Sequence, residues 1–272
     1  MRYFRRFTAA QRVLHVFMML SFLGLAVTGM PLLFSEQPWA RVVARLFGGF
    51  EGAGFIHRSC AVVMIIVFGG HVLHMAYRAV FKKDWKRLLW GPDSMVPQPQ
   101  DAYDMWNHFK WFVHKGPRPT FDRWTYWEKF DYWAVFWGMF IIGGSGLLLW
   151  FPVFFAHFLP GWMFNVATLV HGEEALLAVG FIFTIHFFNA HLRLEKFPVD
   201  DVMFTGRLPE EEFKHERTAE YDRMVATGEI ARLRVAAPPT WYRHFAVFMG
   251  ISAMAVGTSI VVLIILAALR II

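Results

Sequence analysis

Five apolar segments without Asp, Glu, Lys or Arg dominate this sequence of 272 residues. A helix needs about 20 such residues to cross a hydrocarbon core of about 30 Å, and each segment is long enough or nearly so. Lipid cannot satisfy backbone hydrogen bonds, so the segments predict helices and an all-α integral membrane protein. The five segments are Val13–Phe34, Ser59–Tyr77, Tyr132–Pro152, Ala175–Leu192 and Phe245–Leu269.

The fourth segment is the shortest. We expect its helix to begin near Asn165, which brings His171 into the membrane-spanning part. Pro152, Pro160 and Gly161 mark the turn that precedes it. We therefore expect a four-helix core over residues 1–192, including a loop at 78–131, then an extramembrane segment at 193–243 and a fifth helix at 244–272.

The distribution of Lys and Arg predicts the orientation. The N-terminal segment carries four, the loop at 78–131 ten and the segment at 193–243 nine, whereas the connections on the opposite side carry three, none and one. Basic residues accumulate on the cytoplasmic side, so the N-terminus is expected in the cytoplasm and the C-terminus outside. The net charge of +6 reflects this bias and does not indicate nucleic-acid binding.

Both long connections are rich in polar and aromatic residues. Trp106 and five other tryptophans punctuate the first, mixed with Lys and Arg, as in short amphipathic segments at a membrane interface. Glu210–Glu212 and alternating charges mark the second as a solvated helical segment. For both connections, the expectation that we favour is a water-facing cap.

Histidines recur at two depths within the apolar segments. His57 and His71 are 14 residues apart, and His171 and His186 are 15 apart. In a helix these spacings give net rotations of roughly 40° and 60° and rises of about 21–23 Å, so each helix offers two imidazoles on nearly one face. His15 adds a third helix at the inner depth. Facing helices with histidines at matched heights can hold metalloporphyrins by axial ligation.

Cys60 is the only cysteine. A single thiol excludes covalent haem attachment through paired cysteines and a thiolate set for an iron–sulfur cluster. We interpret Cys60 as a small packing residue, and any haem is expected to be a non-covalent b-type haem held by histidine.

Other polar residues in or near the segments are secondary candidates. His74 and His191 lie at the inner depth, where they can hydrogen-bond a carbonyl, a haem propionate or the interface. Arg12 and Arg58 can meet propionates at opposite sides or extend to the interface, and Glu174 can lie near the outer propionates.

Several short motifs together resemble the cytochrome b561 superfamily. The resemblance is closest to the membrane b-type cytochrome subunits of formate dehydrogenases, hydrogenases and thiosulfate reductases, and to cytochrome b modules that work with multihaem cytochromes c. It covers about residues 5–225. The motifs are Arg12-Val-Leu-His15, Thr28-Gly-Met-Pro31, His57-Arg58, Glu128-Lys-Phe-Asp-Tyr-Trp133, Gly146-Leu-Leu-Leu-Trp-Phe-Pro152, His171-Gly-Glu-Glu174, His186-Phe-Phe-Asn-Ala-His191 and Phe197-Pro198.

The resemblance implies two haems b and electron exchange with a quinone. By position, His57 and His171 ligate the outer haem, and His186 ligates the inner haem with His15. His71 lies at a height that suits the inner haem equally well, so the inner level holds one haem or two, and the chain two haems or three.

The resulting hypothesis is a cytochrome b that transfers electrons between a membrane quinone and an extracytoplasmic partner. That partner is expected to be a multihaem cytochrome c, an iron–sulfur protein or a dehydrogenase, within a respiratory complex of a bacterial-type inner membrane. We expect quinone chemistry at the inner level, near His74, Asn189, His191 and His108. Two alternatives are a proton or metal transporter that uses buried histidines, and a histidine-box di-iron oxygenase.

Overall fold

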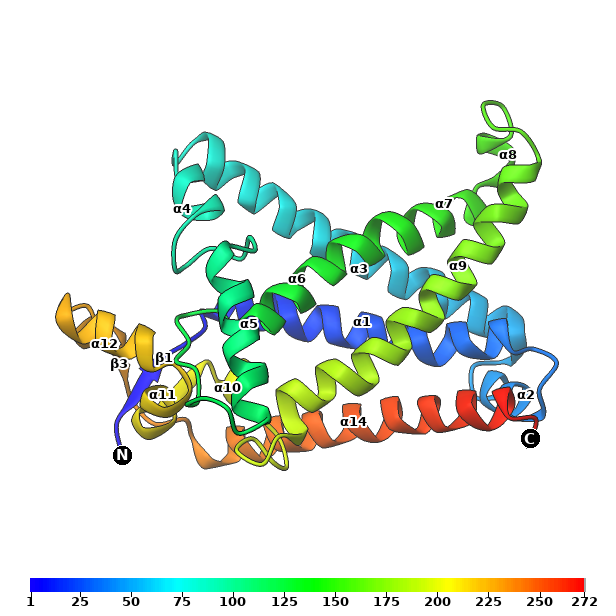
Figure 1. The fold of residues 1–272 in the computed structure, drawn as a ribbon. Coiled ribbons are helices and arrows are strands. Elements are labelled where there is room, and N and C mark those ends of the chain that lie inside the picture. Colours follow the sequence, from blue (N-terminus) through cyan, green and yellow to red (C-terminus); the bar gives the residue numbers. More distant parts are fainter. Residues whose placement is uncertain (272) are drawn as a thin grey trace. The chain divides into compact units, whose positions relative to one another are not determined.

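The computed structural model describes residues 1–271 and is mostly helical (Figure 1). Within these residues five helices are long and apolar enough to cross a membrane, which confirms the predicted all-α integral membrane fold. They are α1 (Ala9–Leu33), α3 (Gly49–Val80), a third span Tyr126–Trp150, a fourth span Trp162–Leu192 and α14 (Thr240–Ala268).

The third and fourth spans contain π-helical turns. The third runs through α6 (Tyr126–Gly138), η1 (Met139–Gly143) and α7 (Gly144–Trp150). The fourth runs through α9 (Trp162–Phe181), η2 (Ile182–His186) and η3 (Phe188–Leu192). Its start at Trp162 confirms that the helix extends well before the apolar run and includes His171.

The chain forms two compact units, each assembled from three separate segments. The first unit comprises Met1–Val13, Gly70–Ala134 and Asp201–Ala246; the second comprises Leu14–Gly69, Val135–Asp200 and Val247–Ile272. Several spanning helices therefore contribute one end to the first unit and the remainder to the second.

In the first unit a small antiparallel sheet brings together distant segments. Its strand order is β2-β1-β3, with Phe4 opposite both Leu208 and Arg234. Phe4, Leu208 and Phe213 pack together beneath it. The elements of this unit outside the spans are β1 (Tyr3–Arg5), α4 (Trp85–Leu89), α5 (Pro99–Phe112), α10 (Val202–Thr205), β2 (Arg207–Pro209), α11 (Glu210–Glu216), α12 (Thr218–Ala226), α13 (Ile230–Leu233) and β3 (Arg234–Val235).

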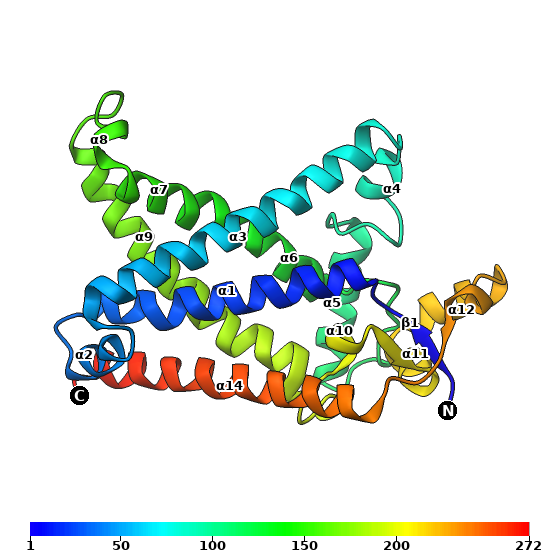
Figure 2. The same ribbon diagram turned by 180° about the vertical axis from the view of Figure 1, so that it is seen from behind.

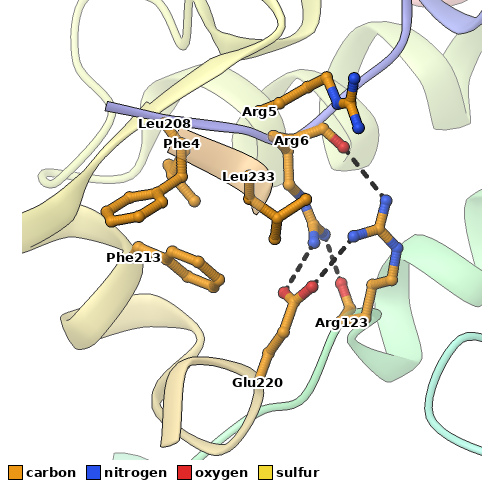
Figure 3. A pocket seen from close by; sticks show the side chains of 8 residues that line it. All are labelled: Phe4, Arg5, Arg6, Arg123, Leu208, Phe213, Glu220 and Leu233. Carbon is orange, nitrogen blue, oxygen red and sulfur yellow. Dashed lines mark hydrogen bonds and ion pairs between the residues drawn. The ribbon is translucent and has the colours of Figure 1, made fainter. Parts of the chain in front are cut away.

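Beside this sheet lies a buried ionic network (Figure 3). Glu220, only 1% exposed, accepts hydrogen bonds from Arg6 Nη1 at 2.9 Å and from Arg123 Nη1 at 3.0 Å. Burial, followed by the charge of Arg217, lowers the pKa of the Arg6 guanidinium to about 10. The segment at 193–243 contains the expected helices, α10 to α13, but it also contributes strands β2 and β3. It buries the charge of Glu220, so it does not form a purely solvated cap.

In the second unit α1, α2 (Pro38–Arg45), α9, η2 and α14 share one hydrophobic core (Figure 2). Met30, Val179, Phe183 and Ile260 are among its buried residues. A Cβ on Gly257 of α14 would lie 2.6 Å from a ring carbon of Phe183, so glycine permits the close approach of α14. The fifth helix is therefore an integral part of this core.

Candidate functional site

His57 of α3 and His171 of α9 face each other within the second unit. Their ring centroids are 6.2 Å apart and their ring planes differ by 76°. A metal held about 2 Å from one nitrogen of each ring, with each centroid about 1.2 Å beyond its nitrogen, places the centroids roughly 6.4 Å apart. The spacing of this pair matches axial ligation of one metal by two imidazoles.

Each ring lies directly against a glycine of a neighbouring helix. A Cβ on Gly29 would lie 2.8 Å from His57 Cε1, and a Cβ on Gly146 would lie 2.9 Å from His171 Cε1. Real Cβ atoms essentially never come so close, so any larger residue would displace the imidazole. These two glycines, one in α1 and one in α7, provide the space that the histidines occupy.

The hydrogen bonds of Thr28 fix the tautomer of His57. The Thr28 hydroxyl donates its single proton to the Gly24 carbonyl at 2.6 Å, and its oxygen lies 3.1 Å from His57 Nδ1. The hydroxyl oxygen must therefore accept from Nδ1–H. The ring also interacts with the Leu25 carbonyl. Nε2 of His57 then carries a lone pair and is the nitrogen able to bind a metal.

The same arrangement recurs at His171. Its Nδ1 lies 3.0 Å from the carbonyl oxygen of Ile142, which can only accept, so Nδ1 carries the proton. Ser145 Oγ lies 3.3 Å from that nitrogen and itself donates to Ile141 at 2.6 Å. Ile142 lies in η1, and such π-helical turns depart from the regular α-helical bonding pattern and are frequent at functional sites.

Two parts of the second unit thus repeat one motif. Thr28-Gly29 supports His57, and Ser145-Gly146 supports His171, each with a carbonyl three residues before the hydroxyl. Metal-binding histidines usually donate their second ring N–H to such an acceptor, which fixes the ring and raises its basicity. The donor set fits a haem iron held between two neutral imidazoles.

A cluster of three histidines lies at the other depth of the second unit. His15 of α1 is close enough to His186 and His191 to interact with both electrostatically. His191 Nδ1 accepts the backbone N–H of Asp200 at 3.2 Å, so its proton is on Nε2. This tautomer is opposite to that of His57, and it leaves His15 and His186 as the better matched ligand pair.

His71 and His74 belong to the first unit. His71 Nε2 forms a hydrogen bond of 2.8 Å with the Tyr132 hydroxyl, so the nitrogen that would bind a metal is engaged by a phenol. His74 is exposed on α3. His108, also in the first unit, hydrogen-bonds the Tyr126 hydroxyl at 3.0 Å within an aromatic cluster. Its expected proximity to a quinone stays a prediction.

The secondary candidates have separate surroundings. In the first unit Arg12 Nη1 donates to the carbonyls of Phe204 at 3.0 Å and Thr205 at 3.2 Å. In the second unit Arg58 is exposed beside His57, and Glu174 accepts from Trp137 Nε1 at 3.1 Å. Arg12 and Glu174 thus take part in local hydrogen bonds.

The sequence motifs included Thr28, Gly29 and Gly146 but assigned no role to the Thr28 hydroxyl and did not include Ser145. Hydroxyls that bond back to their own helix are common in membrane helices, so neither hydroxyl indicated a site. One pattern could have revealed both hydroxyl residues. In each case a hydroxyl residue directly precedes a glycine and faces a histidine of another helix. No model of a known protein family matches the chain and neither does any curated protein, so the resemblance to the cytochrome b561 superfamily stays a prediction.

Proposed function

We propose that this chain is a membrane b-type cytochrome, similar to the cytochrome b561 superfamily, that transfers electrons between a quinone and an extracytoplasmic partner. The observation that carries the proposal is the His57/His171 pair, spaced for one metal and held with both Nδ1 atoms protonated. Neutral imidazoles with this tautomer are the usual axial ligands of a b-type haem.

Haem b, when bound, supplies an iron that gains and loses one electron. The chain's own residues hold and orient it. His57 and His171 provide Nε2 lone pairs, and Thr28 and Ile142 fix the rings by accepting from Nδ1–H. Gly29 keeps the α1 backbone close enough for the ring of His57 to lie against it.

The inner level provides a second ligand pair, His15 with His186. Two ligand levels separated by a rise of about 22 Å on the same helix suit electron transfer across a membrane. A third haem would require His71 to release Tyr132. Exposed apolar side chains on the five spans are consistent with a lipid environment.

The partner is proposed to bind on the C-terminal side, outside a bacterial-type inner membrane. The turn between the third and fourth spans, residues 151–161, lacks charged residues, and Val153, Phe154 and Phe158 are exposed on it. Quinone chemistry moves protons and needs polar groups, and in the second unit Asn189 and His191 supply these at the opposite level. The excess of Lys and Arg in the long connections supports a cytoplasmic location for that level.

The two alternatives explain the site less well. Across residues 1–271 no group of three or more His, Cys, Asp and Glu is placed to hold a metal ion, whereas a di-iron centre would use such a group. Two histidine side chains, such as His57 and His171, would be enough to hold a haem iron. A transporter gives no reason for hydroxyl and glycine pairs that repeat behind each outer histidine.

The test is a haem measurement on the purified full-length chain. A pyridine haemochrome assay should give about two haems b per chain, and the reduced protein should have the absorption spectrum of low-spin haem b. His57→Ala and His171→Ala should each remove the same haem. His157→Ala is the matched control, because His157 is exposed on the 151–161 turn and hydrogen-bonds its own backbone at Val153.

A correctly folded preparation without haem would contradict the proposal. Equal haem content in the wild type and in His57→Ala would contradict the ligand assignment while leaving a cytochrome possible at the inner level.

A further inference from the structure

Helix α5 of the first unit exposes an apolar face without any charged residue. Met105, Trp106, Phe109, Phe112 and Val113 recur at the spacing of one helical face and are 53%, 56%, 55%, 62% and 43% exposed. Trp106 and Phe109 stack on each other with ring centroids 5.8 Å apart. A face this apolar on a water-soluble cap would be unfavourable, because water would contact all five side chains.

Two polar residues that border this face fix α5 in place. Asp101 accepts a hydrogen bond of 2.8 Å from Lys129, whose side chain is buried. His108 bonds the Tyr126 hydroxyl at 3.0 Å, and its ring lies 5.3 Å from that of Trp127. These two polar side chains therefore take part in internal contacts, whereas the five apolar side chains are exposed. In a helix that caps a soluble domain, the apolar side chains would face inward.

These contacts attach α5 to the beginning of the third span. Tyr126, Trp127 and Lys129 lie in the first turn of that span, where a helix enters the membrane. In the same part of the span Phe130 is 62% exposed, as expected of a lipid-facing residue. The Lys110 amine lies 5.8 Å from the Trp106 ring, so a cation borders the apolar face where phosphate headgroups would lie.

We propose that α5 is a membrane-interface helix whose face Met105–Val113 is inserted at the boundary between lipid headgroups and acyl chains. Aromatic side chains prefer this depth, and α5 lying there would gain both apolar burial and contact of Lys110 with anionic headgroups. The lipid that contacts Phe130 would also contact the neighbouring face of α5. A second copy of the chain or a soluble partner would instead have to bind at the membrane surface. The proposal does not depend on haem.

Site-directed spin labelling tests this placement. In the full-length chain with Cys60→Ala, single cysteines replace Phe109 and Trp106, and a nitroxide is attached to each. The protein is reconstituted in vesicles of phosphatidylethanolamine and phosphatidylglycerol. Power saturation then compares the accessibility of each label to oxygen, which concentrates in lipid, and to a water-soluble nickel chelate.

Labels at both positions should be several-fold more accessible to oxygen than to nickel, as should a lipid control at Phe130→Cys. A label at Gln100→Cys, exposed in the first turn of the same helix, serves as the aqueous control with the opposite preference. Nickel accessibility at both positions equal to that at Gln100→Cys would overturn the proposal in favour of a solvated helix. Exclusion of both reagents would also overturn it, because protein would then cover the face.

Discussion

The two compact units bury polar groups in opposite ways. In the first unit both carboxylate oxygens of Glu220 are taken, one by Arg6 and one by Arg123. Within residues 1–271, the hydrogen bonds of His57 and His171 in the second unit involve Nδ1, which leaves the Nε2 lone pair of each half-buried ring available. A buried carboxylate whose charge is paired holds a fold together, whereas a half-buried imidazole with an available lone pair is prepared to bind a ligand.

This difference gives the two sites different roles, one structural and one suited to binding a ligand. Breaking the ion pairs would leave charges uncompensated, which costs free energy and supplies no chemistry. The histidine pair instead combines the correct spacing, tautomer and glycine clearance for a ligand. The same criterion applies to His71, whose Nε2 is engaged by Tyr132 and which therefore resembles the first kind of group.

The largest expected effect concerns the inner histidines. His15→Ala should remove one haem or make it high-spin, because His186 loses its partner, whereas His71→Ala should leave both haem spectra intact. Optical and electron paramagnetic resonance spectra of the purified variants measure this. The opposite result would be loss of the inner haem in His71→Ala and not in His15→Ala. It would show that the hydrogen bond between His71 Nε2 and Tyr132 does not prevent His71 from acting as a ligand.

Glu220→Gln tests the structural side of the comparison. It leaves buried Arg6 and partly buried Arg123 without their shared carboxylate, which should destabilise the first unit by about 3–5 kcal/mol. Limited proteolysis of the segment 201–246 during thermal unfolding in detergent would detect the loss. Glu229→Gln is the control, since Glu229 is exposed, and it should change little. Equal resistance of both variants would show that the network contributes little.

Gly29→Ala tests the clearance at the outer pair. The added methyl would lie 2.8 Å from His57 Cε1. Such overpacking costs about 1–3 kcal/mol, so the affinity of the outer histidine pair for haem should fall roughly tenfold or more. Gly180→Ala is a matched control in α9, because its Cβ would meet nothing within 4 Å. Haem titration of the two apoproteins compares them, and equal affinities would mean that the ring can move without loss of binding.

The sequence was sufficient to predict the spanning helices and to predict that His57 and His171 face each other. Both predictions rest on local properties, the length of the charge-free segments and the spacing of residues along a helix. The fourth helix could be extended to include His171 for the same reason. The sheet around Phe4 and the Arg6–Glu220 pair could not be predicted, since their partners lie more than 200 residues apart in the chain. Strands of two or three residues are also too short to show a detectable alternation of apolar and polar residues.

Removing the hydroxyls of Thr28 and Ser145 should change haem binding least among these variants. It tests most directly whether Nδ1 of each outer histidine carries the proton. Thr28→Val keeps the shape of the side chain but removes the hydroxyl that accepts from His57 Nδ1–H at 3.1 Å. The Leu25 carbonyl is then the remaining acceptor, which should make the ring a weaker donor to iron. We expect roughly tenfold weaker haem binding, the low end for such supporting residues, and a higher reduction potential at the outer haem.

Ser145→Ala should change both quantities less, because His171 retains the Ile142 carbonyl at 3.0 Å. Thr168→Val is the control, since Thr168 lies on α9 and its hydroxyl bonds only the backbone of Phe164 among the contacts of residues 1–271. Redox titration with optical detection and haem titration of the three variants would rank them. If Ser145→Ala shifts the potential more than Thr28→Val, the carbonyl of Ile142 does not hold the proton of His171, and the two halves of the repeated motif work differently.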